Sequence, residues 1–491
     1  MRLSRRHMLA GLLSASATGA WAEAPPRTIR PRYRDQSLRE EPASRQSVPS
    51  GNDLVDRSSL TGVVGFTVAD AATGQVLEAR NPEVGMPPAS TAKALTTMWA
   101  LDRLGPQHRF ETQLIATGPV TNGRIEGDLI LAGGGDPTLD TDGLRSMAVA
   151  LKDAGVREIG GRMRVWTGAL PNLREIDEEQ PAHVAYNPAI GGLNLNYNRV
   201  HFGWERQGGD YEVTMDSPGM RQTAAVTTAR MQVADRRGPV YTYDRGERMD
   251  EWTVARTALG NGGSRWLPVR FPGLYAGEVF QTLAQSQGII SGGAVDYADS
   301  AKGGLLHTHR SDVLPPILTD MLNYSTNITA EVMGLSASQT VGPIGTLAES
   351  AAQMNAWLKR EHGLNSVALE DHSGLGDDSR VSPADMARAM VSSHKGNVLK
   401  PLMKAFPLDD TRFAVTAKTG TLNFVSALTG YVTGPKQGRT LAFSILTGDI
   451  PRRDALTIEQ RERPEGGRSW IASSKYLQRQ LLESWGKAYL T

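Results

Sequence analysis

The sequence contains no cysteine, which excludes disulfides, thiolate metal sites and cysteine nucleophiles. It also lacks an excess of charge: 53 Lys and Arg residues stand against 52 Asp and Glu residues, so no overall field draws the chain to nucleic acid or to an anionic membrane. The nine histidines show no metal-binding spacing such as HExxH. We therefore expect no metal, no cofactor, no nucleic-acid partner and at most a peripheral contact with a membrane.

Apolar and charged residues are present in ordinary amounts, 40% and 21%. This balance is typical of globular proteins and differs from that of disordered chains and multi-span membrane proteins. Because 491 residues exceed what a single hydrophobic core accommodates, two or more domains are expected.

The first 22 residues have the order of an export signal. Three arginines within the first six residues precede a short apolar run over residues 8–20, and Ala20-Trp21-Ala22 is a typical cleavage pattern. The paired arginines also resemble a twin-arginine signal, and the apolar run is too short to anchor the chain in a bilayer. We therefore expect a signal peptide over residues 1–22, export to the periplasm, and a linker over residues 23–52, which are rich in Pro, Arg, Glu and Ser.

Apolar patterns then divide the chain into regions. Two β-rich runs over residues 63–69 and 75–79 flank a turn and predict a hairpin, and the apolar spacing over residues 90–104 predicts a helix. Between about residues 112 and 273, short alternating runs cut by Gly, Pro and Asn indicate a separate, mainly β region. The later patterns predict helices over residues 276–287 and 313–322, strands over 427–432 and 440–446, and a helix over about 470–485.

A hydroxyl and an amine lie three residues apart in Ser90-Thr91-Ala92-Lys93, at the start of the first predicted helix, so both fall on one face. A serine is inert at its own pKa, but a desolvated, partly deprotonated lysine can accept its proton. The helix N-terminus adds free backbone N–H groups that suit an oxyanion. Alone the tetrapeptide is weak evidence, because about one such match arises by chance in a chain of this length. Ser392-Ser393-His394-Lys395 is another match.

Two further short motifs favour Ser90 over Ser392. Ser325-Thr326-Asn327 follows a predicted helix, and Lys418-Thr419-Gly420-Thr421 precedes the two predicted C-terminal strands. S-x-x-K, then S-x-N, then K-T-G is the order found in penicillin-binding proteins and class A β-lactamases. Ser392 falls between the second and third motifs, so it cannot fill the first role. Each short motif also has an ordinary structural interpretation, since Ser50-Gly51-Asn52 matches S-x-N too.

The first two motifs suit an acyl-transfer reaction. Ser90 is the candidate nucleophile, and Lys93 is the candidate base that accepts its proton. Ser325 can relay a proton to the leaving amine. The Asn327 amide can orient the substrate backbone.

The third motif suits recognition of a peptide with a free carboxyl end. Lys418 offers a positive charge and Thr419 a hydroxyl to a terminal carboxylate. Gly420 permits a peptide to approach the strand edge as an additional strand. The backbone N–H groups of Ser90 and Thr421 are the candidate oxyanion-hole donors.

With these residues the chain resembles the penicillin-binding protein 4 type of D-Ala-D-Ala carboxypeptidase, the class C low-molecular-mass penicillin-binding proteins or peptidase family S13. The resemblance covers nearly the whole mature chain. Beyond the three motifs it rests on Pro88-Ala89 before Ser90, Leu104-Gly105-Pro106, Arg109-Phe110, Gly127-Asp128-Leu129, Gly135-Asp136-Pro137-Thr138-Leu139, Leu193-Asn194-Leu195-Asn196-Tyr197-Asn198, Ala330-Glu331, Asp371-His372-Ser373-Gly374-Leu375 and Gly430-Tyr431.

Within this superfamily, the long separation between Lys93 and Ser325 requires an inserted domain. The resemblance implies an α+β fold, in which a transpeptidase-like catalytic domain with a five-stranded antiparallel sheet and helices spans residues 53–111 and 274–491. A mainly β inserted region interrupts it over residues 112–273. The resemblance also implies removal of terminal D-Ala from peptidoglycan stem peptides, hydrolysis of D-Ala to diaminopimelate crosslinks, and acylation by β-lactams.

One residue departs from the family pattern. Trp166 stands where relatives often carry an Asp, which argues against recognition of a diaminopimelate side chain at that position. Two alternative functions stay open. A β-lactamase or serine esterase needs a base for fast deacylation, such as a Glu acting through water, and the sequence does not locate one. A non-catalytic wall-binding or sensing module is expected to have lost a motif, and all three are intact.

Overall fold

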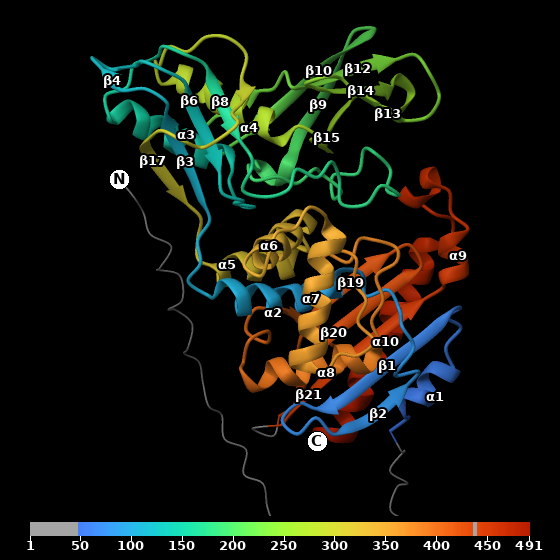
Figure 1. Cartoon of the computed structure of the whole chain (residues 1–491). Helices are drawn as coiled ribbons and strands as arrows, with labels where there is room; N and C mark the ends of the chain where they lie inside the picture. The colour runs from blue at the N-terminus through green and yellow to red at the C-terminus, as the bar shows by residue number, and fades with distance from the viewer. Residues whose placement is uncertain (1–47, 436–438) are drawn as a thin grey trace, which may run out of the picture. The chain divides into compact units, whose positions relative to one another are not determined.

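The computed structural model describes residues 48–435 and 439–491 (Figure 1). The predicted signal peptide, and the predicted linker up to residue 47, lie outside the described residues. The last two residues of the predicted linker belong to a helix, α1 (Gly51–Asp56). The helix begins there because the Ser50 side chain accepts a hydrogen bond from the backbone N–H of Asp53, while the Asp53 carboxylate accepts one from the backbone N–H of Ser50.

A six-stranded antiparallel sheet gathers strands from both ends of the chain (Figure 1). In order across the sheet the strands are β18 (Lys404–Phe406), β19 (Ala414–Leu422), β20 (Val425–Thr433), β21 (Thr440–Gly448), β1 (Val63–Asp70) and β2 (Val76–Arg80). The predicted hairpin and both predicted C-terminal strands are present. The sheet has one strand more than the five that the family resemblance implies, and the three-residue β18 lies at its edge.

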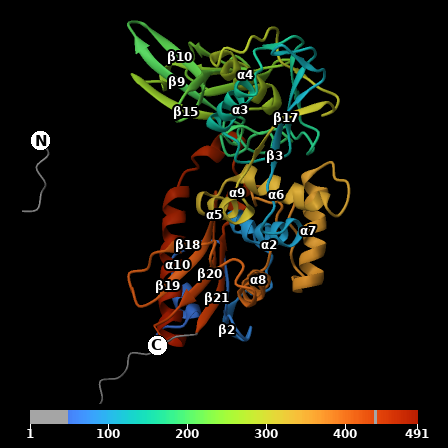
Figure 2. The ribbon, with the colours of Figure 1, turned by 90° about the vertical axis from the view of Figure 1, so that its left-hand side faces the viewer.

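Helices cover both faces of this sheet (Figure 2). On one face, α1 and α10 (Gly467–Tyr489) pack through a core that includes Phe66, Leu481 and Trp485. On the other face, α8 (Pro383–Lys395) contacts β1, β20 and β21 through a second core. Because both faces are covered, β20 and β21 are buried along nearly their whole length, which explains why their sequences do not alternate regularly between apolar and polar residues.

The second core extends into a layer of helices next to the sheet. Its helices are α2 (Ala92–Leu104), α5 (Leu314–Tyr324), α6 (Asn327–Gln339) and α7 (Leu347–His362). Helices α2 and α6 contact each other, which brings the segment after the first motif beside the segment after the second. The short helix α9 (Ile450–Asp454) follows β21.

The chain between α2 and α5 forms four further sheets around a core of its own. Their strands are β3 (Glu111–Ala116), β4 (Val120–Thr121), β5 (Arg124–Ile125), β6 (Leu129–Gly133), β7 (Glu158–Ile159), β8 (Met163–Trp166), β9 (Arg199–Gln207), β10 (Asp210–Pro218), β11 (Thr223–Ala225), β12 (Ala229–Ala234), β13 (Tyr241–Arg245), β14 (Asp250–Ala255), β15 (Gly262–Pro268), β16 (Asp296–Tyr297) and β17 (Gly304–Arg310). Two helices, α3 (Thr141–Asp153) and α4 (Pro272–Ser286), pack against each other beside them.

This region extends beyond residue 273, where the sequence analysis ends it. Helix α4 contacts α3 and β8, and β17 pairs with β3 in an antiparallel ladder. The chain therefore returns to the helices of the first sheet only at α5. The helix over residues 276–287 was expected, but an amphipathic pattern does not say which core the helix faces. Within residues 48–435 and 439–491, no helix has the length and apolar character that a membrane crossing requires.

Candidate active site

Ser90 lies in a short 3-10 helix, Ala89–Thr91, directly before α2, and its side chain is half-buried. The preceding residue, Ala89, has a φ of 45°, a left-handed conformation that is costly for any residue with a Cβ atom. Two glycines accommodate this turn. A Cβ atom at Gly374 would lie 2.0 Å from the Ala89 carbonyl oxygen, and one at Gly420 would lie 2.7 Å from the Pro88 carbonyl oxygen. Gly420 thus lets β19 lie against the segment that carries Ser90, a neighbour different from the substrate strand that we predicted for it.

Lys93 is fully buried one turn further along, and its Nζ has three polar neighbours. Nζ lies 3.0 Å from Ser90 Oγ, 2.8 Å from Asn327 Oδ1 and 2.8 Å from the Ser373 carbonyl oxygen. Burial lowers the pKa of Lys93 to about 8, although the nearby carboxylates of Asp371 and Glu331 oppose the shift. About a tenth of Lys93 therefore holds a free amine at pH 7.

Ser325 and Lys418 form a second pair beside the first. Ser325 ends α5 in a left-handed conformation, with a φ of 61°, and its Oγ accepts a hydrogen bond of 3.0 Å from Lys418 Nζ. Lys418 Nζ also donates to the Thr419 carbonyl oxygen at 2.7 Å. Burial lowers the pKa of Lys418, and the positive charge of Lys93 lowers it further.

Asn327 is the first residue of α6 and connects three parts of the chain. Its Oδ1 accepts from Lys93, and its Nδ2 donates to the Tyr186 carbonyl oxygen at 2.9 Å. The structure thus brings together all five residues that the sequence analysis names as catalytic, namely Ser90, Lys93, Ser325, Asn327 and Lys418.

These residues lie at a cavity of about 1010 Å³. Ser90, Ser325, Asn327 and Thr421 line it, whereas the exposed Thr419 is not among its lining residues. The rest of the wall comes from Gly374 and Leu375, from the inserted region through Gln180 and Tyr186, and from residues of the C-terminal part of the chain, namely Leu422, Asn423, Arg453, Arg461, Glu462, Arg463, Pro464, Gly466, Gly467, Arg468, Ser469 and Ile471.

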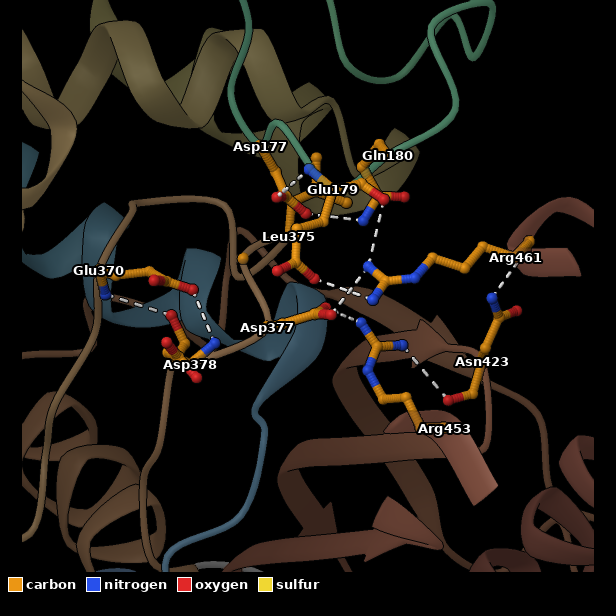
Figure 3. A network of polar contacts seen from close by, with 12 residues as sticks. Asp177, Glu179, Gln180, Glu370, Leu375, Asp377, Asp378, Asn423, Arg453 and Arg461 are labelled. Atoms are coloured by element: carbon orange, nitrogen blue, oxygen red, sulfur yellow. Dashed lines mark hydrogen bonds and ion pairs between the residues drawn. The ribbon is translucent and has the colours of Figure 1, made fainter. Parts of the chain in front are cut away.

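A network of ionic contacts holds this wall in place (Figure 3). Asp377 pairs with Arg453 and, at 2.9 Å, with Arg461. Arg461 also pairs with Glu179 of the inserted region at 2.8 Å, and the Asn423 side chain donates to the Arg461 carbonyl oxygen at 2.6 Å. The network joins segments that are far apart in the sequence, and no local motif marks them, so these residues could not be recognised from the sequence.

The serines of the two competing motif matches, Ser392 and Ser50, are not among the residues that line the cavity. Ser392 is on α8, where its Oγ hydrogen-bonds to His362 Nδ1 at 2.7 Å, and Ser50 caps α1. Trp166 packs on a small apolar cluster with Ile115 and Ile130, outside the residues that line the cavity. Among residues 48–435 and 439–491, no three His, Asp or Glu side chains are grouped so that they could hold a metal ion.

The antiparallel sheet, its covering helices and the inserted β region define the penicillin-binding, transpeptidase-like class of folds. The crystal structure of penicillin binding protein 4 (dacB) from Haemophilus influenzae has this fold, with a TM-score of 0.70 at 21% identity, over 88% of this chain and 99% of that chain. A crystal structure of the same protein complexed with a β-lactam gives a TM-score of 0.69 at 20% identity, over 89% and 99% of the two chains.

The family is narrower than the fold class. The model of the D-Ala-D-Ala carboxypeptidase 3 (S13) family matches residues 52–462. The D-alanyl-D-alanine carboxypeptidase of Actinomadura sp. (strain R39) is 28% identical over 474 residues, which cover 84% of this chain and 85% of the relative. The chain belongs to the D-Ala-D-Ala carboxypeptidase 3 (S13) family and is a serine-type peptidase, a hydrolase. The predictions of fold class, family and enzyme class are confirmed.

Proposed function

We propose that this chain cleaves the terminal D-Ala-D-Ala bond of peptidoglycan stem peptides, and D-Ala to diaminopimelate crosslinks, through an acyl-enzyme on Ser90. One observation carries the proposal. Lys93 Nζ lies 3.0 Å from Ser90 Oγ, and Ser90 lies at a cavity large enough for a peptide. The matched family and its curated relative supply the substrate class.

Acylation begins at the Ser90–Lys93 pair. The free amine of Lys93 takes the hydroxyl proton of Ser90, and Oγ attacks the carbonyl carbon of the penultimate D-Ala. The backbone N–H groups of Ser90 and Thr421 stabilise the resulting oxyanion. Ser325, held by Lys418, relays the proton that Lys93 took from Ser90 to the leaving amine, so the peptide bond breaks, an ester forms on Ser90 and D-Ala departs.

The edge of β19 supports binding of the peptide as an additional strand. β18 pairs with β19 only as far as Ala417, and within the part of the chain that the structure describes no strand pairs with this edge from Lys418 to Leu422. The main chain there is available to a substrate, with the Lys418 ammonium and the Thr421 side chain beside it. Because Thr419 does not line the cavity, we assign the hydroxyl contact with the terminal carboxylate to Thr421.

The two carboxylates nearest the pair argue for slow deacylation. Both Glu331 and Asp371 are buried, and their oxygens accept hydrogen bonds from backbone N–H groups of residues 372–376. Neither lines the cavity in which a water would attack the ester. This favours the peptidase over a β-lactamase. The relative that was crystallised with a β-lactam supports acylation of Ser90 by the same class of compound.

The N-terminal pattern supports a location. We propose that residues 1–22 direct export and are removed, and that the mature enzyme works in the periplasm, where its peptide substrates lie. The Glu23–Asn52 segment precedes the catalytic sheet as a linker, ending in the first turn of α1.

Substitution of the nucleophile tests the proposal. Ser90→Ala should abolish both labelling by a fluorescent penicillin and release of D-Ala from a pentapeptide, whereas Ser392→Ala should change neither. Mass spectrometry of the labelled wild-type enzyme should find a long-lived penicilloyl group on the peptide that contains Ser90. An adduct on another peptide would refute the assignment of the nucleophile, and rapid turnover of the adduct would favour the β-lactamase.

A further inference from the structure

Two sequence features shared with the family, Ala330-Glu331 and residues 371–375, take no part in the reaction described above. They meet behind Lys93. Glu331 is fully buried on α6, and its two carboxylate oxygens accept hydrogen bonds from the backbone N–H groups of His372, at 3.0 Å, and Ser373, at 2.8 Å. The carboxylate of Glu331 therefore fixes the position of the peptide unit that leads to the Ser373 carbonyl.

Other contacts hold the same loop. The Asp371 carboxylate accepts hydrogen bonds from the backbone N–H groups of Gly374 at 2.6 Å, Leu375 at 2.9 Å and Gly376 at 2.8 Å. The Thr96 hydroxyl of α2 donates to the His372 carbonyl oxygen at 2.6 Å. On the α6 side, a Cβ atom at Gly334 would lie 2.0 Å from the His372 ring. The loop is thus packed directly against the two helices that carry Lys93 and Asn327.

The three neighbours of Lys93 Nζ restrict the direction of its lone pair. Asn327 presents Oδ1 to Lys93, because its Nδ2 donates to the Tyr186 carbonyl oxygen. The oxygens of Asn327 and Ser373 can only accept hydrogen bonds, whereas the Ser90 hydroxyl can donate one. When Lys93 loses a proton, its two remaining N–H groups stay on the two accepting oxygens. Its lone pair then faces Ser90 Oγ, as proton transfer requires.

We propose that Glu331 is a positioning residue for acylation: by holding the backbone of His372 and Ser373, it keeps the Ser373 carbonyl on Lys93 and so directs the Lys93 lone pair to Ser90. The inference rests on the proposed roles of Ser90 and Lys93. Glu331 follows Asn327 by four residues on α6, so both project from the same helix face. One helix therefore sets both of the oxygens that restrict the Lys93 amine.

Charge gives Glu331 a second effect on Lys93. The charged groups that face Lys93 are the carboxylates of Asp371 and Glu331 and the ammonium of Lys418. Burial lowers the pKa of Lys93, and the two carboxylates limit the fall. Removal of the Glu331 charge should therefore lower the pKa of Lys93 further. Burial also raises the pKa of Glu331, so this effect grows as Glu331 ionises at alkaline pH.

The test is Glu331→Gln in the mature enzyme, with acylation by a chromogenic penicillin followed by stopped flow from pH 6 to pH 10. Gln keeps the size of Glu but turns an NH2 group towards one of the two backbone N–H groups, which displaces the Ser373 carbonyl. We expect the plateau rate constant of acylation to fall about tenfold or more, because misplaced reacting groups lose rate steeply. The pH midpoint should move to lower pH, while the non-covalent affinity for penicillin changes little.

The matched control, Glu361→Gln, makes the same chemical change at an exposed site on α7 and should behave as wild type.

A folded Glu331→Gln enzyme with the wild-type plateau and pH midpoint would overturn the proposal. A loss of rate without a shift of the midpoint would also overturn it, since general loosening of the structure predicts that result. If Glu331→Gln does not fold, Glu331→Asp, which keeps the charge but retracts the carboxylate, should retain the midpoint with a lower plateau, and a wild-type plateau would refute the role. Hydrogen exchange in the wild type gives a test without any variant, because rapid exchange of the His372 and Ser373 amides would contradict their hydrogen bonds to Glu331. Absence of acylation in the wild type would instead refute the proposed function.

Discussion

Replacing Gly374 by alanine should disable Ser90 without touching any catalytic side chain. Gly374 has a φ of 73°, and an added Cβ atom would lie 2.0 Å from the Ala89 carbonyl oxygen and 3.0 Å from the Ala92 Cβ. A left-handed conformation costs an L-residue about 1–2 kcal/mol, and overpacking of a rigid site adds about 1–3 kcal/mol. The free energy of unfolding should therefore fall by about 2–5 kcal/mol, and the turn that carries Ser90 should be displaced.

Gly363→Ala is the matched control. Gly363 also has a positive φ, 66°, but the nearest atom to an added Cβ would be 3.9 Å away, in the Arg388 side chain. It should lose only the conformational part, about 1–2 kcal/mol, and keep the wild-type acylation rate.

Urea unfolding and penicillin acylation, measured on both variants, separate the two effects. A misplacement of the reacting groups by about 1 Å costs on the order of a hundredfold in rate, so we expect at least that loss for Gly374→Ala. If Gly374→Ala matches Gly363→Ala in both stability and acylation rate, the loop does not support the Ser90 turn, and the reasoning is refuted.

Two further predictions concern charge. If Lys93 is the base, as we propose, the acylation rate should rise with pH by about tenfold between pH 7 and pH 9 and then level off, because burial lowers the pKa of Lys93 to about 8. A rise that continues towards pH 10.5 would mean that Lys93 keeps its ordinary pKa. Asp377→Asn removes the partner that Arg453 and Arg461 share, so it should cost about 2 kcal/mol and speed hydrogen exchange in residues 450–471. Unchanged exchange in that segment would show that the ionic network does not hold the wall.

The sequence indicated which side chains gather at the candidate site, because their residue types, order and spacing carry the information. Their order relative to the other two motifs distinguishes Ser90 and Lys93 from the similar match that begins at Ser392. The two long C-terminal strands were predictable because burial on both faces makes their sequences rich in apolar and β-branched residues. The roles of the individual site residues remain predictions.

The parts that could not be predicted depend on the main chain or on distant contacts. The Ser373 carbonyl that contacts Lys93 has no residue-type signal, because every residue has a carbonyl. The fit of Gly420 against the Ser90 turn depends on how β19 is placed in three dimensions. The end of the inserted region was placed too early, because the pairing of β17 with β3 joins strands that are far apart in the sequence.

The pairing of β1 with β21 also has a consequence for biosynthesis. Strand β1 precedes all three motifs in the sequence, yet its partner β21 follows all three. Such a non-local pairing cannot form until the ribosome has passed all three motifs. A nascent or truncated chain that ends before β21 therefore carries every residue of the three motifs without a working hydrolase, and activity arises only after β21 has been made.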